Sequence, residues 1–222
     1  MFKVTPQTQG PAIKTLVNIY TISDEHFEDQ AIQLKKLFYK YKARRIVIDG
    51  NGLGIGLVDY MIKSQESEAG DFLPDFGVEN DEDGYYKKYR TNVTEFDAMY
   101  ILKANAPINT ECHSNAQAQL SSGKVKFLID ERAAREKLLG TQKGQKMKPE
   151  ERAEYLKPFT LTSILKEEMM NLREENEGVN IILKQANKSI RKDKFSAFEY
   201  GLYYIKQEEE RKKKKKKFNA KE

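Results

Sequence analysis

The sequence contains a single cysteine, Cys112, and no tryptophan among its 222 residues. A lone thiol excludes an intrachain disulfide framework and a zinc site built from cysteines. Long apolar runs are also missing, and the first residues lack the hydrophobic region of a signal peptide. These absences predict no transmembrane segment and no secretory route, so we expect a cytoplasmic protein in a reducing environment.

Two glycine motifs of nucleotide-binding proteins are missing as well. A GxGxxG pattern that started at Gly50 would need a glycine at position 55, where the chain has Ile55. No Gly-Lys-Ser/Thr ending follows, so the phosphate-binding loop of ATPases is absent too. A nucleotide-binding α/β protein is therefore disfavoured.

Charge is abundant and unevenly distributed. Lysine and arginine number 39 and aspartate and glutamate 34, which gives a net charge of +5. Acidic residues are concentrated in residues 66–83, whereas the chain turns basic from residue 184 onward and includes six consecutive lysines at 212–217. We expect residues 208–222 to form a Lys-rich flexible tail that adds salt-dependent affinity for polyanions.

Hydrophobic periodicity predicts alternating strands and helices. Strands are expected at residues 12–20, 46–49, 98–103, 125–129 and 179–183. Helices are expected from Ser23 or Asp24 to 41, and at 53–63, 109–120, 130–139 and 193–210, with a short helix from 149 and another at 162–172. Residues 64–94 are expected to be a long surface loop and residues 140–147 a mobile one. The pattern predicts an α/β fold with a mixed or parallel sheet, in which residues 12–49 form a β–α–β crossover.

The segment IVIDGNGLGIGLVD, residues 46–59, is the most informative motif. Three β-branched residues form a strand that ends at Asp49, and four alternating glycines follow. Ligands of open α/β sheets bind at the carboxyl ends of strands, so this carboxylate suits a metal ion or a phosphate-bearing substrate. A plain turn or a helix N-cap explains an Asp-Gly pair equally well.

A second acid, Asp193, lies at the predicted start of the last helix, where the helix dipole favours a carboxylate. From spacing alone an ordinary N-cap is the better interpretation. Asp59 lies ten residues after Asp49 and either supports a metal ligand without touching the metal or is an exposed helical residue. His113 is predicted to be a surface residue of a helix.

Three segments together resemble the nuclease domain of tailed-phage large terminases. They are IVIDGNGLGIGLVD at 46–59, LKPFTLTSILKEEMMNL at 156–172 and NKSIRKDKFSAFEY at 187–200. The resemblance implies an RNase H-like mixed central sheet flanked by helices, with the nuclease domain over residues 1–207. It also implies that Asp49 and Asp193 are catalytic residues and ligands of two Mg²⁺ or Mn²⁺ ions.

The same resemblance implies the cutting of concatemeric viral DNA during genome packaging, as a phage or prophage protein in the bacterial cytoplasm. Expected partners are double-stranded DNA, the portal protein, the small terminase subunit and an ATPase motor domain. The family's first acid and the ATPase precede the part that matches, so the domain is expected to be N-terminally truncated. The alternative is a catalytically inactive DNA-binding or assembly fragment of a split or truncated terminase.

Basic residues beside the second acid are the candidates for contacts with the DNA backbone. They are Lys184, Lys188, Arg191, Lys192 and Lys194.

Overall fold

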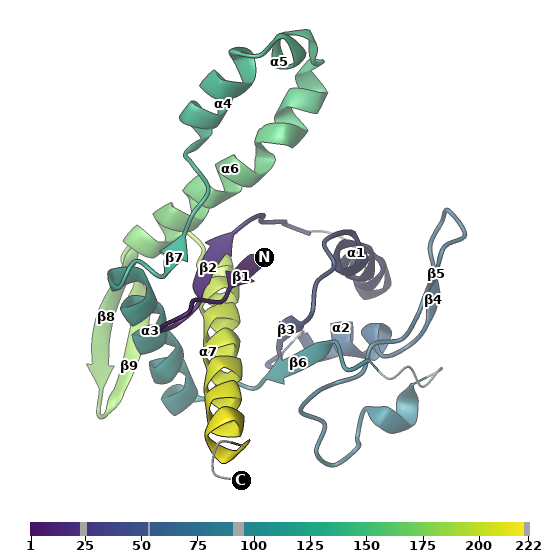
Figure 1. The fold of residues 1–222 in the computed structure, drawn as a ribbon, viewed down its shortest axis with the longest axis vertical. Helices are drawn as coiled ribbons and strands as arrows, with labels where there is room; N and C mark the ends of the chain where they lie inside the picture. The colour runs from purple at the N-terminus through teal and green to yellow at the C-terminus, as the bar shows by residue number, and fades with distance from the viewer. Residues whose placement is uncertain (23–25, 53, 91–95, 220–222) are drawn as a thin grey trace. The chain divides into compact units, whose positions relative to one another are not determined.

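A computed structural model describes residues 1–22, 26–52, 54–90 and 96–219 (Figure 1). The chain divides into two compact units, of which the first combines Met1–Thr21 with Ala106–Glu222 and the second is Ile22–Asn105. Sequence analysis predicts one domain over residues 1–207, whereas the structure groups these residues into two units. Each unit is described by itself below.

The first unit contains a three-stranded sheet in the order β1-β2-β7. β1 (Phe2–Thr5) pairs antiparallel with β2 (Ile13–Leu16), and β2 pairs parallel with β7 (Val125–Lys126). Two of the predicted strands are therefore confirmed, although both are shorter than expected. Alternate residues of β2 are buried, as expected for a strand with one face on the core.

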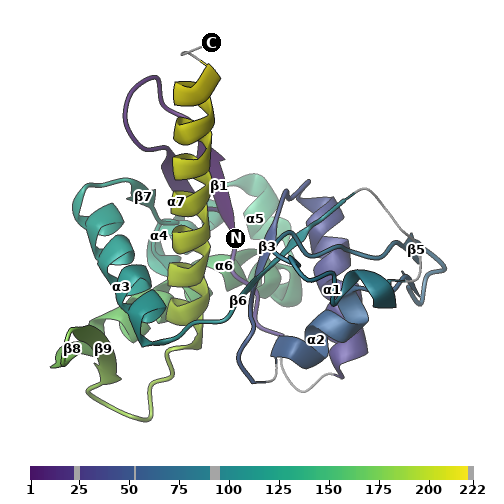
Figure 2. The same ribbon diagram turned by 90° about the horizontal axis from the view of Figure 1, so that it is seen from below.

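Five helices make up most of the first unit among its described residues. They are α3 (Ala106–Ser121), α4 (Glu131–Leu139), α5 (Gln142–Lys146), α6 (Pro149–Met170) and α7 (Asp193–Asn219). Asp130 caps α4, because the amide of Ala133 donates to the Asp130 side chain at 2.9 Å. Figure 2 shows α3 beside α7, and α3 also contacts the strand β9 (Asn180–Gln185).

Two predictions for the first unit are wrong, and one of its strands was not predicted. Residues 140–147 contain the helix α5 in place of the expected loop. The helix predicted from residue 149 and the helix predicted at 162–172 are parts of the single helix α6, which has Pro158 inside it. The strand β8 (Leu172–Glu177) was not predicted; it forms an antiparallel hairpin with β9 (Asn180–Gln185), which confirms the strand expected at 179–183. The sequence of β8 is mostly charged and exposed, so it lacks the apolar alternation that identifies a strand.

Two apolar clusters stabilise the first unit. The larger one lies between the sheet, α3, α6 and α7 and contains Leu16, Ala116, Val125, Leu165, Phe195, Phe198 and Leu202. The smaller one lies within α4 and α6 and contains Ala134, Leu138 and Leu156. The helices α4–α6 form an arm that extends away from the sheet (Figure 1). The smaller cluster holds this arm together.

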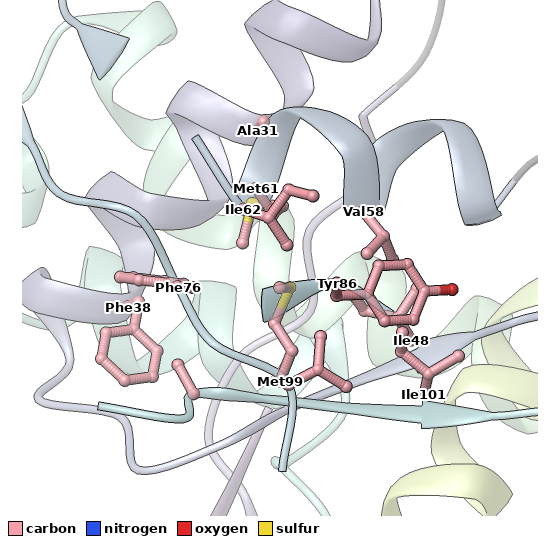
Figure 3. Packing of buried hydrophobic residues seen from close by; sticks show 12 residues of the cluster. Ala31, Phe38, Ile48, Val58, Met61, Ile62, Phe76, Tyr86, Met99 and Ile101 are labelled. Carbon is pink, nitrogen blue, oxygen red and sulfur yellow. The ribbon is translucent and has the colours of Figure 1, made fainter. Parts of the chain in front are cut away.

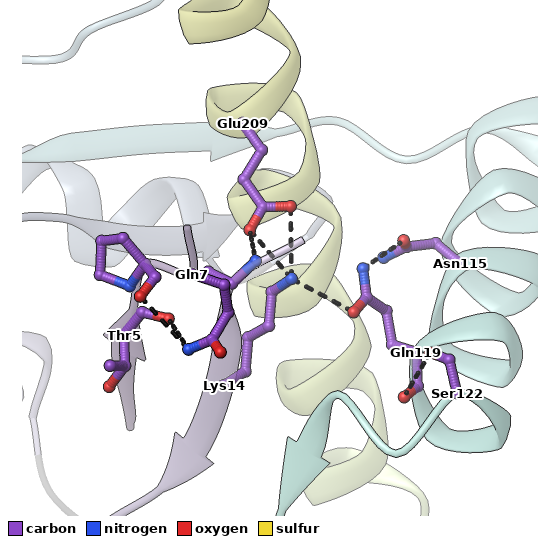
Figure 4. A network of polar contacts seen from close by, with 9 residues as sticks. Thr5, Gln7, Lys14, Asn115, Gln119, Ser122 and Glu209 are labelled. Carbon is purple, nitrogen blue, oxygen red and sulfur yellow. Dashed lines mark hydrogen bonds and ion pairs between the residues drawn. The ribbon is translucent and has the colours of Figure 1, made fainter. Parts of the chain in front are cut away.

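A buried polar network joins β2 to two helices of the first unit (Figure 4). The ammonium of Lys14, a fully buried residue, lies 3.0 Å from Oε1 of Glu209 on α7 and donates to Gln119 of α3 at 3.2 Å. The amide of Ala12 donates to the same Glu209 carboxylate at 2.9 Å. The charge is therefore neutralised and hydrogen-bonded inside the unit, as burial requires.

The second unit contains α1 (Phe27–Lys40), β3 (Ile46–Asp49), α2 (Gly54–Met61) and β6 (Met99–Leu102). β3 and β6 pair in parallel as a two-stranded sheet. All four elements confirm predictions. The predicted caps Ser23 and Asp24, and Leu53 at the predicted start of the second helix, lie outside the described residues.

Residues 64–90 are more than the surface loop that the sequence predicts. They contain the short hairpin β4 (Gln65–Glu66) and β5 (Phe72–Leu73) and the 3₁₀ helix η1 (Lys87–Tyr89). Phe76 and Tyr86 from this segment are buried in the apolar cluster of the second unit, together with Phe38 and Met99 (Figure 3). The many acidic residues give this segment the composition of a surface loop, so the sequence does not indicate that these two aromatic residues are buried. Residues 91–94 lie outside the described residues.

The mixed α/β class is confirmed. Among the described residues, β2 pairs with β1 and β7 whereas β3 pairs with β6, so the pairings do not include the expected crossover from β2 to β3. Residues 208–219, predicted to be part of a flexible tail, are the last turns of α7. No helix in the described parts of the chain is both long enough and apolar enough to cross a membrane.

Candidate functional site

Asp49 is the last residue of β3, and its side chain is exposed. The amide of Asn51 donates to Asp49 Oδ1 at 3.0 Å, and the Asn51 side chain donates to the carbonyl of Ala104 at 2.9 Å. The turn-forming role that the sequence left open for Asp49 is therefore present. The same turn fixes the direction of the carboxylate at the end of the strand.

The connection from β3 to α2 leaves no room for a side chain at Gly54. A Cβ atom on Gly54 would lie 1.7 Å from the carbonyl oxygen of Asp49. Glycine therefore allows α2 to begin directly against the end of the strand. The packing of this turn places the Asp49 carboxylate.

A groove of about 480 Å³ follows β3 within the second unit. It is lined by Leu34 of α1, by Ile46, Val47, Ile48 and Asp49 of β3, and by Asn51, Gly54 and Leu57. Consecutive strand residues point to opposite faces of a sheet, so a groove lined by four in succession follows the strand's edge. Among the described residues β3 pairs only with β6, which leaves this edge open. The groove is apolar along the strand and polar at the Asp49 end.

Asp193 begins α7 in the first unit, and 75% of its side chain is exposed. Its Oδ2 lies 3.9 Å from a guanidinium nitrogen of Arg191. As the first residue of the helix it benefits from the positive end of the helix dipole. The nearby Glu168 is buried and accepts hydrogen bonds from the amide of Phe195 and from Lys194, so it stabilises the start of α7.

The two aspartates belong to different units, with Asp49 in the second and Asp193 in the first. Within the described residues, no three His, Cys, Asp or Glu side chains lie close enough together to hold a metal ion. A pair of divalent cations needs several carboxylate oxygens. The described residues of either unit alone therefore do not fit a two-metal centre.

Asp59 lies on the exposed side of α2. Burial raises the pKa of the nearby Tyr86, and the negative charge of Asp59 adds to that shift. Asp59 is thus an exposed helical residue whose charge acts on a tyrosine of the second unit's core.

Most of the five candidate DNA-binding cations have a partner inside the first unit. Lys184 pairs with Glu175, and the hydrogen bond to that carboxylate raises the lysine's pKa. Lys194 pairs with Glu168 at 3.4 Å, and Lys192 donates to the carbonyl of Leu183 at 3.4 Å. Arg191 faces Asp193, as described above, and Lys188 is exposed. Since several of these charges are compensated, this segment is less cationic than its sequence indicates.

One polar pair in the first unit is not indicated by the sequence. His113 Nδ1 lies 2.6 Å from Glu199 Oε2, and only 13% of the histidine side chain is exposed, so the surface position predicted for it is wrong. Burial raises the pKa of Glu199, and the hydrogen bond with His113 opposes the shift. Burial also raises the pKa of the neighbouring Cys112 to about 12, so its thiol is unreactive. The partners are 86 residues apart, and no local pattern connects them.

Comparison with known proteins gives no match to a family model, to a curated protein or to a solved structure.

Proposed function

We propose that this chain is the nuclease part of a tailed-phage large terminase, a Mg²⁺- or Mn²⁺-dependent DNA endonuclease that cuts concatemeric viral DNA during packaging. The observation that carries the proposal is the exposed Asp49 carboxylate, held by a tight turn at the end of β3 and at the polar end of a groove. The carboxyl end of a parallel strand is a common place for ligands in α/β proteins. The RNase H-like class implied by the sequence resemblance is part of this proposal.

The metal centre would need ligands beyond Asp49. Asp193 is the second ligand that the resemblance implies, and we propose that a third acid comes from a strand added beside Asp49. The open edge of β3 offers a position for a further strand, since an added strand pairs through its backbone and fills the apolar groove. An acid at the end of such a strand would lie beside Asp49. We propose that the ATPase part of the terminase supplies this strand.

The proposed partners are those of a packaging motor: double-stranded DNA, the portal protein, the small terminase subunit and the ATPase domain. The proposed location is the cytoplasm of the bacterial host. Retention of DNA is supported by the net charge of +5 and by the exposed lysines Lys212–Lys215 at the end of α7.

Cleavage of supercoiled plasmid in Mn²⁺ tests the proposal, with the chain alone and with the acid-bearing strand added as a peptide or as part of the upstream protein. We expect nicking that falls by at least about 100-fold in Asp49→Asn and in Asp193→Asn, because each substitution removes a charged ligand. Asp83→Asn, an exposed acid in the second unit, is the matched control and should cleave like the wild type. Cleavage that persists in both variants would reject the assignment of these acids.

A catalytically inactive DNA-binding or assembly fragment is the second candidate. It is favoured by the lack of three grouped metal-binding side chains among the described residues. This alternative predicts DNA binding that needs no divalent cation and is unchanged in Asp49→Asn. It also predicts no cleavage with or without the added strand.

A further inference from the structure

The arm formed by α4, α5 and α6 ends in a tip of concentrated positive charge. Residues 137–149 contain four lysines and no acidic residue. All four are exposed: Lys137, Lys143, Lys146 and Lys148. The sequence predicts a mobile loop over residues 140–147 of this segment.

Three cations further along the arm differ from those of the tip because they have carboxylate partners. Arg132 pairs with Glu136 at 3.0 Å, Arg135 pairs with Glu131 at 2.6 Å, and Lys157 lies 3.6 Å from Glu154. These pairs neutralise the flanks of the arm. Its net positive charge is therefore located in residues 137–149, directly before the exposed acids Glu150 and Glu151.

The backbone of the tip is held in place by several contacts. Thr141 caps α5 by accepting a hydrogen bond from the amide of Gly144 at 3.0 Å. A Cβ atom on Gly144 would lie 2.0 Å from the carbonyl oxygen of Leu138, so α5 packs directly on the end of α4. The guanidinium of Arg152 donates to the carbonyl of Gln145 at 2.9 Å. The tip lysines consequently extend from a fixed backbone, which reduces the entropy lost when they bind a ligand.

We propose that the tip of this arm binds the phosphate backbone of duplex DNA without reading its sequence. The proposal relies on the proposed function for the identity of the polyanion. Lysine ammonium groups form point-charge contacts with phosphates. The α5 sequence QKGQK has no aromatic residue on which unpaired bases could stack. Leu139 is the exposed large apolar residue of the tip, and one such side chain is too little to anchor the tip in a lipid layer. A duplex backbone is the polyanion that these features favour.

The test measures how salt weakens DNA binding. We would titrate the full chain, without divalent cation, into a short fluorescent DNA duplex at several salt concentrations and compare wild type with K143Q/K146Q/K148Q. Each lost phosphate contact should reduce the slope of log affinity against log salt by about 0.9, so the variant should lose about 2 to 3 units of slope. Its affinity at low salt should fall by about tenfold or more.

The variant K3Q/K36Q/K40Q is the matched control, because it removes three exposed lysines from outside the arm and changes the net charge equally. An equal loss in both variants, or no loss in the tip variant, would overturn the proposal. A wild type that does not bind the duplex would overturn it as well. If the wild type cleaves plasmid but the tip variant binds DNA unchanged, the nuclease proposal holds and the proposal for the tip fails. If binding depends on the tip but no cleavage occurs, the proposal for the tip holds and the nuclease proposal fails.

Discussion

Lys35 shows how one residue places a charge in the core of the second unit. The residue is fully buried, its ammonium donates to the carbonyl of Lys63, and it lies 5.6 Å from the centre of the Phe76 ring. Burial lowers its pKa to about 8, and the negative charge of Asp75 opposes part of that shift. Asp75 is itself buried and pairs with Arg90 at 2.7 Å.

The lowered pKa predicts a pH dependence of stability. Between about pH 8 and 10.5 the unfolded chain keeps the Lys35 proton while the folded chain has released it, so this residue's contribution to stability rises with pH. We expect the difference in free energy of unfolding between wild type and Lys35→Met to shift in favour of the wild type across this range. Urea titrations at pH 7.5 and pH 10 measure it, with the exposed Lys36→Met as the control. A difference that is constant with pH would contradict the prediction.

At the residue scale, the sequence predicted local positions but not distant partners. Asp49 at the end of a strand and Asp193 at the start of a helix depend on neighbouring residues, and both positions are confirmed. The pairs of His113 with Glu199 and of Lys14 with Glu209 depend on tertiary packing. Whether the two aspartates share a metal centre stays a prediction.

At the element scale, the turn from β3 to α2 is the connection on which the candidate site depends. Gly54→Ala would place a methyl group against the Asp49 carbonyl, so the strand end or the start of the helix must move. We expect a loss of at least about 1–3 kcal/mol of unfolding free energy, the usual cost of overpacking. Chemical denaturation measures this loss.

Gly84→Ala is the comparison for that variant. Gly84 has a φ of +65°, but a Cβ atom there would meet nothing within 4 Å, so only backbone strain of about 1 kcal/mol is expected. If the two substitutions cost the same, the close approach at Gly54 does not hold the turn.

Elements with their own start signals were the most predictable. Asp130 caps α4 at its start, and Phe195, Phe198 and Leu202 form a buried apolar stripe on α7, so the signals for both helices are local. The sequence predicts two helices where the structure has the single helix α6, although Pro158, a residue type that normally interrupts a helix, lies inside it. In α6 the proline is accommodated, and the hydroxyl of Thr162 donates to its carbonyl at 2.7 Å. The charged strand β8 is recognised by its pairing with β9, and its own sequence gives no local signal of a strand.

At the scale of the whole molecule, the two units have separate apolar cores. Leu202→Ala in the first unit and Met99→Ala in the second each remove a fully buried side chain, at a cost of about 2–5 kcal/mol. We expect each substitution to reduce amide hydrogen-exchange protection mainly in its own unit, because the lost contacts are internal to that unit. Mass spectrometry of the exchanged protein measures this, and each variant is the control for the other. Equal loss of protection in both units would show that they unfold as one.

The division into units was the least predictable feature. The alternation of strands and helices runs through both units without a change in composition at residues 21 or 105, so nothing local indicates a boundary. Strand pairing makes the division visible, because β2 pairs with the distant β7 whereas β3 pairs with β6.

The discontinuous first unit has a consequence for synthesis of the chain on the ribosome. Glu209, which neutralises Lys14, is translated 195 residues after it. The first two strands therefore emerge with an unpartnered lysine and wait while the intervening unit, whose sequence is continuous, is completed. The nascent protein thus finishes its inserted portion first and closes around its own beginning only when the last helix leaves the exit tunnel.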